Sequence, residues 1–468
     1  MSASFEKAER KYLDTHAEPE VALCGALDSA QRGYGHVLAI PAAGEADELE
    51  RTLASLPDGP LGPVLTIVVV NATPDAPAWV QQSNAQTLET FGRRKDRAQR
   101  LTPRATLYAG EGGDVLVLDR ATRGHQLPPG QGVGLARKIG VDLALALVLT
   151  GRVASPWIHV SDADVRFPED YFHQVLEDRG GSSSALLYRF QHRPIGDARS
   201  YDAALQYEAA LRYYVTGLRF AGSRYAFHSI GSTLVLRASA YAQVRGFPRR
   251  QAAEDFYLLN KIAKVGRVTP LTGMPLALSS RVSRRVPFGT GAAIARMLED
   301  TEPRRYTYHP ALFHHLRAWL DALEATLAGR ASGAGVTRAL KDQIADFADA
   351  DPAVDASRLW AALKHTGALS SANDALAAPA RSVRRRVDDT FDGFRTVKLL
   401  HALRDSGFAD LPLRDALQGA SFLPFAGEIH ELPLETLRSR LEVIESQPRR
   451  IGNAKTLYGS EKPFLFKS

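Results

Sequence analysis

The stretch "WIHVSDADVRFPEDYF", residues 157–172, joins an apolar segment directly to two carboxylates that stand one residue apart. The apolar part predicts a short buried strand that ends near residue 161. Because alternate side chains of an extended chain point to the same side, Asp162 and Asp164 should face the same way. Two adjacent carboxylates repel each other unless a cation lies between them. The stretch therefore predicts a strand whose carboxyl end presents a cation site.

Upstream of this strand, apolar segments alternate with segments of helical spacing. The predicted strands are "HVLAIP" (36–41), "VLTIVVV" (64–70) and "DVLVLD" (114–119). The predicted helices cover 45–56, a polar stretch from about 79 to 100, and 133–149. Strands that are apolar throughout and alternate with helices are typical of βαβ units in a parallel sheet covered on both faces. Ligands of such sheets bind beyond the carboxyl ends of the strands, which is where the two aspartates stand.

Downstream the pattern is mixed, with further strands predicted at 185–190 and 232–237 and a helix that opens with Glu254 and Asp255. From about residue 297 the chain is rich in Ala and Leu at helical spacing. We therefore expect an α/β fold of three parts. They are an N-terminal helical extension (1–32), a domain with a mostly parallel mixed sheet and helices on both faces (33–296), and an all-helical C-terminal domain (297–468).

Composition bounds the class of protein. The 468 residues are 45% hydrophobic and 24% charged, which is ordinary for globular chains and too long for one core. The longest apolar run is far shorter than a membrane helix, and the first residues lack an apolar signal core, so we expect a cytoplasmic protein without a transmembrane segment. Cys24 is the single cysteine, which excludes an internal disulfide and a cysteine-built metal site. Any metal needs oxygen or histidine ligands.

The net charge is +6, and basic residues gather at 93–97 ("RRKDR") and 381–386 ("RSVRRR"). Acidic residues stand close to both runs, and no aromatic residues interleave with them. Such runs are more typical of solvated faces than of nucleic-acid binding. We expect no nucleic-acid partner.

The sequence contains its own control for the aspartate motif, because "DAD" occurs at 162–164 and again at 349–351. No apolar strand precedes the second copy, which we assign to a solvated helix end. Oxygen ligation by the first copy suits Mg²⁺ or Mn²⁺, ions that also bind substrate phosphates. The alternative is a turn whose aspartates cap the next helix. Glu254 and Asp255 have an alternative too, because acids at a helix start are stabilised by the helix dipole.

Taken in order, these segments resemble the family 2 glycosyltransferases with the GT-A fold, over about residues 36–290. The resemblance rests on "VLAIPAAGEADELERTLASL", "TIVVVN", "GQGVGLARKIG", "WIHVSDADVRFPEDYF", "GSTLVLRASAYAQVRGF" and "AEDFYLLNKIAKVG". It implies sugar transfer from a nucleotide-diphosphate donor of the UDP or GDP type, with Asp162 and Asp164 holding a divalent cation on the diphosphate. It also implies that Asp255 accepts the proton of the acceptor hydroxyl and that Glu254 supports it.

The same resemblance places the donor beside Pro41, Glu45, Asn71, Arg137 and Lys138. Several of these positions depart from the family pattern, since Asn71 stands where an aspartate is usual and Lys138 where an asparagine is usual. Ala42 and Ala43 replace the usual aromatic residue and asparagine. The departures leave the donor nucleotide open, although Asn71 can still bond a base edge and Lys138 can approach a phosphate.

The segment 279–293, "SSRVSRRVPFGTGAA", combines arginines with a glycine loop. Arg281, Arg285 and Thr290 would suit a diphosphate clamp, and a basic linker is the alternative. His228 is a candidate for the acceptor pocket, with a buried core histidine as its alternative.

The resulting functional hypothesis is an inverting, non-processive, metal-dependent hexosyltransferase, since the Gln-Arg-Trp signature of processive members is missing. Two alternatives stay open. One is a retaining GT-A enzyme resembling the mannosylglycerate and glucosylphosphoglycerate synthases, and the other is a noncatalytic scaffold that binds nucleotide sugars. The acceptor is unknown. The helical domain could recognise it, contact a membrane surface or pair subunits in a homo-oligomer.

Overall fold

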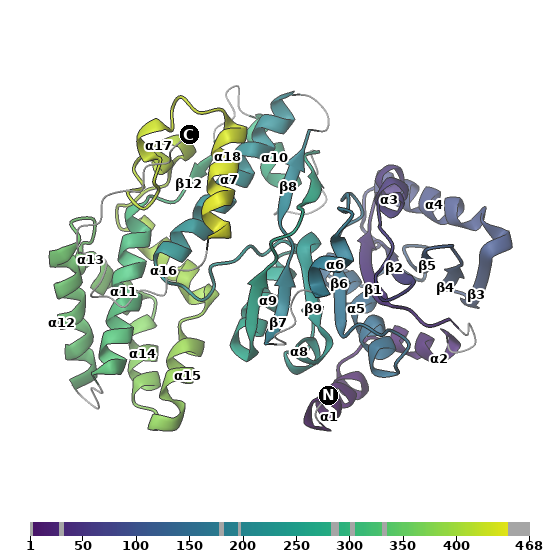
Figure 1. Cartoon of the computed structure of the whole chain (residues 1–468), viewed down its shortest axis with the longest axis horizontal. Helices are drawn as coiled ribbons and strands as arrows, with labels where there is room; N and C mark the ends of the chain where they lie inside the picture. The colour runs from purple at the N-terminus through teal and green to yellow at the C-terminus, as the bar shows by residue number, and fades with distance from the viewer. Residues whose placement is uncertain are drawn as a thin grey trace. The chain divides into compact units, whose positions relative to one another are not determined.

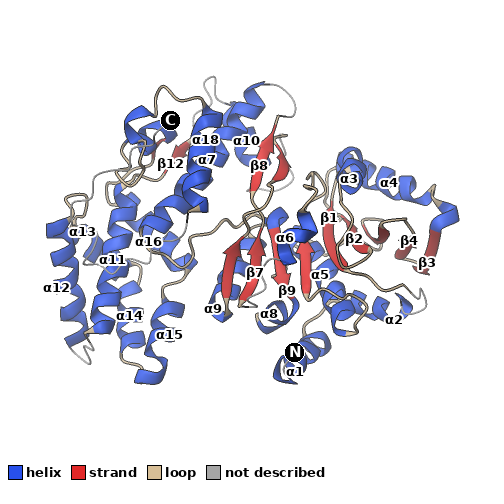
Figure 2. Cartoon of the chain, in the orientation of Figure 1, coloured by secondary structure: helices blue, strands red, loops and turns tan. Residues whose placement is uncertain are grey.

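The computed structural model describes residues 3–27, 32–176, 182–194, 198–281, 290–299, 305–329 and 335–447. The chain divides into two compact units, the first made of Met1–Glu208 and Phe227–Arg304, the second of Ala209–Ala226 and Arg305–Ser468. The first unit is mixed α/β and the second is almost entirely helical (Figures 1 and 2). Helix α7 (Ala198–Phe220) contributes to both units, which no sequence pattern indicated.

The first unit is built on a nine-stranded mixed sheet of order β10-β7-β9-β6-β1-β2-β5-β4-β3. Its four middle strands, β6, β1, β2 and β5, are parallel, and the β3–β4 hairpin adds an antiparallel edge. The strands are β1 (His36–Ala42), β2 (Val64–Asn71), β3 (Ala98–Thr102), β4 (Ala105–Tyr108), β5 (Gly113–Arg120), β6 (Trp157–Val160), β7 (Ser183–Leu187), β9 (Leu234–Arg237) and β10 (Arg267–Pro270).

Helices cover the sheet on both faces. The helices of the first unit, besides α7, are α1 (Ala3–Thr15), α2 (Leu23–Leu27), α3 (Ala46–Ala54), α4 (Ala78–Gly92), α5 (Val133–Leu149), α6 (Tyr171–Leu176), α8 (Ala238–Gln243), α9 (Glu254–Val265) and α10 (Thr290–Glu299), with 3₁₀ turns η1 (Pro19–Ala22), η3 (Lys95–Arg97) and η4 (Gly231–Thr233). Right-handed crossovers put α3 and α4 on one face, because β1, β2 and β5 follow one another in one direction. The return from β5 to β6 runs the opposite way and puts α5 on the other face, where it packs against β1, β2 and β6.

The strand order reverses between β1 and β6, which makes their carboxyl ends the switch point of the sheet. Strand β1 is fully buried and pairs with β2 along its whole length, but with β6 only from Val37 to Ala39. Pro41 therefore lies where β1 has no β6 partner, so its missing N–H leaves no gap in the ladder. The carboxyl ends of β1 and β6 therefore diverge after Ala39, and the segments that follow these two strands can hold the residues of a binding site.

The predicted strands at 36–41, 64–70 and 114–119 and the helix at 133–149 are confirmed. Two predictions of local structure were wrong. The polar helix expected to reach residue 100 ends at Gly92, and β3 follows it, because Ala98–Thr102 pairs with β4 instead of extending an exposed helix. The strand expected at 185–190 breaks into β7 and β8 (Phe190–Arg193), and β8 leaves the main sheet to pair with β11 (Leu276–Ser279).

The second unit packs its helices around a single hydrophobic core. Trp319, Phe313 and Leu316 of α11 lie at the centre of this core with no exposed surface. Its elements are α11 (Ala311–Ala328), α12 (Gly335–Ala350), α13 (Ala356–His365), α14 (Ala368–Leu376), α15 (Ala380–Thr390), α16 (Gly393–Asp405), α17 (Leu413–Gln418) and α18 (Leu434–Ser446), with η5 (Ala426–Glu428) and a two-stranded ribbon of β12 (Tyr306–Thr307) and β13 (Leu411–Pro412).

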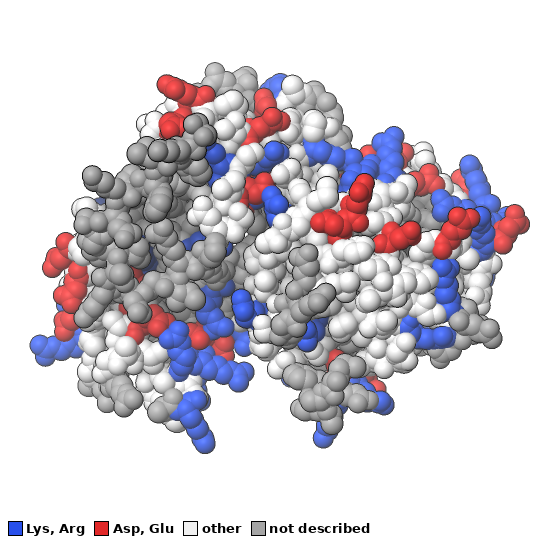
Figure 3. Space-filling model, viewed as in Figure 1, with Lys and Arg blue, Asp and Glu red and all other residues white. Residues whose placement is uncertain are grey.

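Acidic and basic side chains are interspersed on the face drawn in Figure 3. Arginines of the two basic runs also have acidic partners: Arg93 pairs with Glu89, Arg94 with Glu50, and Arg385 with Asp389. Among the helices that the structure describes, none combines the length and the apolar content needed to cross a bilayer.

Candidate active site

Three segments of the first unit bring the predicted acids together at the switch point of the sheet. The chain after β6 carries Asp162 and Asp164, the chain after β1 carries Glu45, and the first turn of α9 carries Glu254 and Asp255. From Ser161 to Arg166 the side chains alternate between buried and partly exposed, with both aspartates partly exposed. The two carboxylates therefore face the same side, as an extended segment requires.

Arg137 of α5 connects two of these segments. Its guanidinium contacts the Glu254 carboxylate through Nη1 and the Asp162 carboxylate through Nη2. The Arg137 and Glu254 side chains are only 6% and 3% exposed, whereas Asp162 is 37% exposed. A planar guanidinium with several N–H donors can hold two carboxylates at once, which a lysine cannot do with the same geometry. Arg137 thus fixes α9 against the chain after β6.

Arg281 forms a second bridge beside the first. Its Nε lies 3.1 Å from Asp164 Oδ2, and its Nη2 contacts the Glu45 carboxylate. Arg281 lies two residues after β11 and Glu45 three residues after β1, so this ion pair connects the chain after β11 to the chain after β1. The two aspartates of the motif are each held by a different arginine.

Electrostatics link the acids further. Burial, together with the nearby charge of Asp162, raises the pKa of the Asp164 carboxyl above its ordinary value, although Arg281 opposes the rise. Burial also raises the pKa of Asp255, with Asp162 adding to the rise and Arg137 opposing it. Asp255 accepts a hydrogen bond of 2.7 Å from the backbone N–H of Phe256. Asp162, Asp164 and Asp255 therefore belong to one charge cluster, and a raised pKa makes Asp255 a better proton acceptor than a solvated aspartate.

Close backbone packing holds this cluster in place. Gly134 in the first turn of α5 donates its N–H to the Arg250 carbonyl at 3.0 Å, and a Cβ at Gly134 would meet the carbonyl oxygens of Pro248 and Arg250 at 2.6 Å. The loop that leads into α9 therefore rests directly on α5. This loop ends at Ala253, whose φ of 59° is unusual for a residue with a Cβ and turns the chain into α9.

The donor set fits a divalent cation in part. Asp162 Oδ2 and Asp164 Oδ1 make no hydrogen bond or ion pair within the described residues, so each aspartate retains an oxygen for a metal. Burial is the main reason for the raised pKa of Asp164, and the charge of Asp162 adds to it; a cation between the two carboxylates would relieve that second part. No group of three or more potential protein ligands gathers anywhere in the described part of the chain. A cation here would therefore need water and substrate oxygens, as Mg²⁺ commonly does.

The donor-side residues predicted on the first two strands end up near the same edge. Asn71 is buried at the end of β2 and donates to the carbonyls of Ala42 at 3.2 Å and Val69 at 3.0 Å. Its own carbonyl accepts from Asn84 Nδ2 at 2.9 Å, and Asn84 Oδ1 accepts from the Gly44 N–H at 2.9 Å. Asn71 and Asn84 thus tie the ends of β1 and β2 to α4. Pro41 is a buried residue inside β1.

Lys138 lies in a different environment from the one predicted. Its ammonium is buried, 2.6 Å from Tyr12 Oη and 2.7 Å from Asp142 Oδ2, with Glu18 at 3.9 Å. Successive residues of a helix point about 100° apart, so Lys138 faces α1 while Arg137 faces the acids. The partners of this ammonium are structural, and Lys138 is not retained here as a donor ligand.

The remaining predicted residues are His228, Arg285 and Thr290. The His228 ring lies edge-on to Phe190 with the centroids 5.0 Å apart. Arg285 lies outside the described residues. Thr290 is the first residue of α10, and its side chain is not among those described.

Sequence reasoning missed a second charged group beside Asp164. Glu48 Oε2 accepts from Arg166 at 2.7 Å and from Arg193 at 3.2 Å. Burial alone would raise the pKa of Glu48, but these arginines outweigh it and hold the pKa below its ordinary value. The three residues are 27 or more positions apart, and no spacing pattern links them. Only the pairing of β8 with β11 brings Arg193 to this edge.

A scan against known protein families and a search of curated proteins give no match for this sequence. Among solved structures, the mannosyltransferase PcManGT from Pyrobaculum calidifontis, in complex with GDP-Man and Mn²⁺, aligns with 82% of this chain and 97% of its own. The TM-score is 0.32 and the sequence identity is 14%. Similarity at this level supports no conclusion about fold or function, so the geometry of the charge cluster carries the assignment.

Proposed function

We propose that this chain is a metal-dependent glycosyltransferase of the GT-A type. In this proposal it transfers a single sugar from a nucleotide-diphosphate donor to an acceptor hydroxyl with inversion. One observation carries the proposal: carboxylates from three separate segments meet at the switch point of the sheet, where open α/β sheets bind their ligands. A purely capping role would not require Asp162 and Glu254, which are 92 positions apart, to share one arginine.

Asp162 and Asp164 would hold the divalent cation through their second oxygens. Such an ion, when bound, neutralises charge on a diphosphate leaving group. The chain would supply further positive charge through Arg281, whose Nη1 makes no hydrogen bond within the described residues and whose side chain is 28% exposed. A guanidinium in that state can turn a free N–H toward a phosphate oxygen.

Asp255 would act as the general base. In the proposed step a carboxylate oxygen of Asp255 takes the proton of the acceptor hydroxyl, and the hydroxyl oxygen bonds to the anomeric carbon. The bond from that carbon to the diphosphate oxygen breaks, and its electron pair leaves with the diphosphate. Glu254, held by Arg137, would position the first turn of α9 and so the Asp255 carboxylate.

Donor binding and transfer should be measured separately. A thermal-shift screen of UDP- and GDP-sugars with Mn²⁺ should find a donor that raises the melting temperature, because a ligand that binds only the folded state stabilises it. Asp164→Asn should abolish the metal-dependent part of that shift. Asp255→Asn should keep the shift while transfer to a hydroxyl acceptor is lost.

Asp349→Asn is the matched control, because Asp349 is an exposed aspartate in the second "DAD" copy. Asp349→Asn should change neither the metal-dependent thermal shift nor the transfer activity. If no nucleotide sugar shifts the melting temperature with or without a metal, the chain is not a transferase of this kind. Retained transfer by Asp255→Asn would remove Asp255 from the base role, and a product with the donor's anomeric configuration would favour the retaining alternative.

A further inference from the structure

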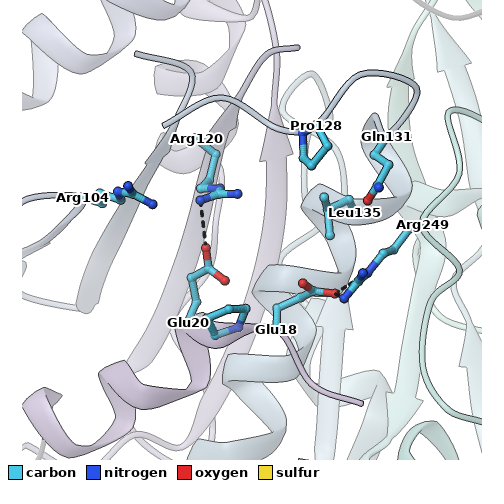
Figure 4. Close-up of a pocket in the computed structure, with 9 residues that line it drawn as sticks. Glu18, Glu20, Arg104, Arg120, Pro128, Gln131, Leu135 and Arg249 are labelled. Atoms are coloured by element: carbon cyan, nitrogen blue, oxygen red, sulfur yellow. Dashed lines mark hydrogen bonds and ion pairs between the residues drawn. The ribbon is translucent and has the colours of Figure 1, made fainter. Parts of the chain in front are cut away.

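A cavity of about 230 Å³ lies in the first unit, on the side of α5 that faces η1 (Figure 4). Its walls come from the turn after α1, the β3–β4 turn, the end of β5, the loop before α5 and the loop before α9. The residues that line it are Glu18, Pro19, Glu20, Arg104, Arg120, Pro128, Gln131, Leu135 and Arg249. A space of this size can hold several water molecules or, in their place, a compact ligand.

Three arginines surround the cavity from two sides. Arg104 and Arg120 approach from one side and Arg249 from the other (Figure 4). Arg249 forms an ion pair with Glu18 at 2.8 Å, and Arg120 forms a looser one with Glu20 at 3.5 Å. The net charge of the lining is therefore +1 when both acids are ionised. Burial raises the pKa of Glu18, so its carboxylate is more easily protonated than a solvated one.

Two of the arginines have hydrogen-bond donors to spare. The Arg104 guanidinium has no hydrogen bond or ion pair within the described part of the chain, and the residue is exposed. Arg120 Nε is buried without a partner there. A guanidinium carries five N–H donors in a fixed fork, which matches the oxygens of a phosphate better than those of a neutral ligand. The positively charged lining and the unused donors both favour an anion.

The cavity is separate from the candidate active site. Leu135 lines the cavity and Arg137 holds the active-site acids, and these residues point about 160° apart around α5 at 100° per residue. Lys138, which faces Glu18, lies on the cavity side. An anion in the cavity would therefore not occupy the position of the donor diphosphate.

We propose that this cavity binds a small anion with two phosphate groups. Arg104 and Arg120 contact one group and Arg249 contacts the other. The site does not depend on the transferase assignment, since none of its lining residues belongs to the charge cluster around Asp164. The cavity and the candidate active site are nevertheless connected through the loop before α9. Arg249 of the cavity stands on this loop, five residues before Glu254, and the loop packs against Gly134. An anion bound in the cavity should therefore reduce the motion of the loop before α9.

Inorganic pyrophosphate is the probe, titrated calorimetrically into the full chain at constant ionic strength with a chelator present. The unmodified protein should bind one pyrophosphate, and inorganic phosphate should bind at least roughly tenfold more weakly because it can engage only one side. Arg104→Gln should weaken pyrophosphate binding by roughly tenfold, the loss expected for charge-assisted hydrogen bonds. Arg104 is exposed, so this change should leave the melting temperature unaltered.

Two comparison variants decide where the anion binds. Arg100→Gln removes an exposed arginine of β3 outside the cavity, and Arg281→Gln removes one of the two arginines of the candidate active site. Both should keep the unmodified affinity, and hydrogen exchange should slow in residues 247–253 when pyrophosphate is added. The proposal is overturned if pyrophosphate does not bind, if Arg100→Gln weakens binding as much as Arg104→Gln, or if only Arg281→Gln weakens it. Equal affinity for phosphate would overturn the assignment of two phosphate groups.

Discussion

Replacement of Arg137 by methionine tests the central contact of the proposed site. The Arg137 and Glu254 side chains are almost completely buried, so the change leaves the Glu254 carboxylate without its cation in a place that water does not reach. Removing one partner of a buried ion pair costs about 3–5 kcal/mol, because the remaining charge stays desolvated. We expect a loss of that size in the free energy of unfolding of the first unit at pH 8.

The loss should shrink when Glu254 is neutralised as well. In the double variant Arg137→Met, Glu254→Gln the uncompensated charge is gone, so the cost should fall below the sum of the two single costs by roughly 1–3 kcal/mol. Arg51→Met is the matched control. Arg51 pairs with Glu48 from an exposed position, and Glu48 keeps Arg166 when Arg51 is removed. Its cost should stay below about 1 kcal/mol.

The assay must report on the first unit alone. Urea titration followed by pulsed hydrogen exchange and mass spectrometry does this when peptides from β1 and β2 are followed, because both strands are buried in that unit. A cost of less than about 1 kcal/mol for Arg137→Met, or strict additivity in the double variant, would refute the buried bridge and with it the position of α9 in the proposed mechanism.

Three further changes test other parts of the first unit. Gly134→Ala should drive its new methyl group into the carbonyls of the loop before α9 and so lower transfer activity. Gly33→Ala is the control, because a Cβ at Gly33 meets nothing within 4 Å, and it should leave the activity unchanged. Equal activity of the two variants would contradict the close packing at Gly134. Lys138→Met should lower the melting temperature and speed hydrogen exchange in α1 while the donor-induced thermal shift persists, and a lost shift would return Lys138 to the donor site. Burial lowers the pKa of His36 from 6.5 to about 4, so the unfolded chain binds the extra proton between these values and stability falls as the pH drops through that window. His36→Phe should remove about 3 kcal/mol of this acid destabilisation, measured as the difference in urea midpoint between pH 7 and pH 4, and an unchanged difference would contradict the assignment.

Much of the α/β architecture could be read from local pattern. The segments at 36–41, 64–70 and 114–119 are mostly apolar, and mostly apolar runs of that length are typical of strands covered on both faces. The β3–β4 hairpin could not be read in this way. Its first strand, Ala98–Thr102, is largely exposed and polar, so it carries no periodic signal, and only its pairing with β4 makes it a strand.

The sequence by itself determined that Asp162 and Asp164 end a buried strand and face one way, because backbone alternation and hydrophobic burial act over a few neighbouring residues. Tertiary structure alone decided which cation each acid meets. Arg137 and Arg281 reach the aspartates from 25 and 117 positions away, and Lys138, one residue beyond Arg137, turns to Tyr12 and Asp142 instead. The direction of a charged side chain depends on the packing of whole elements against one another, and no local spacing in the sequence records that packing.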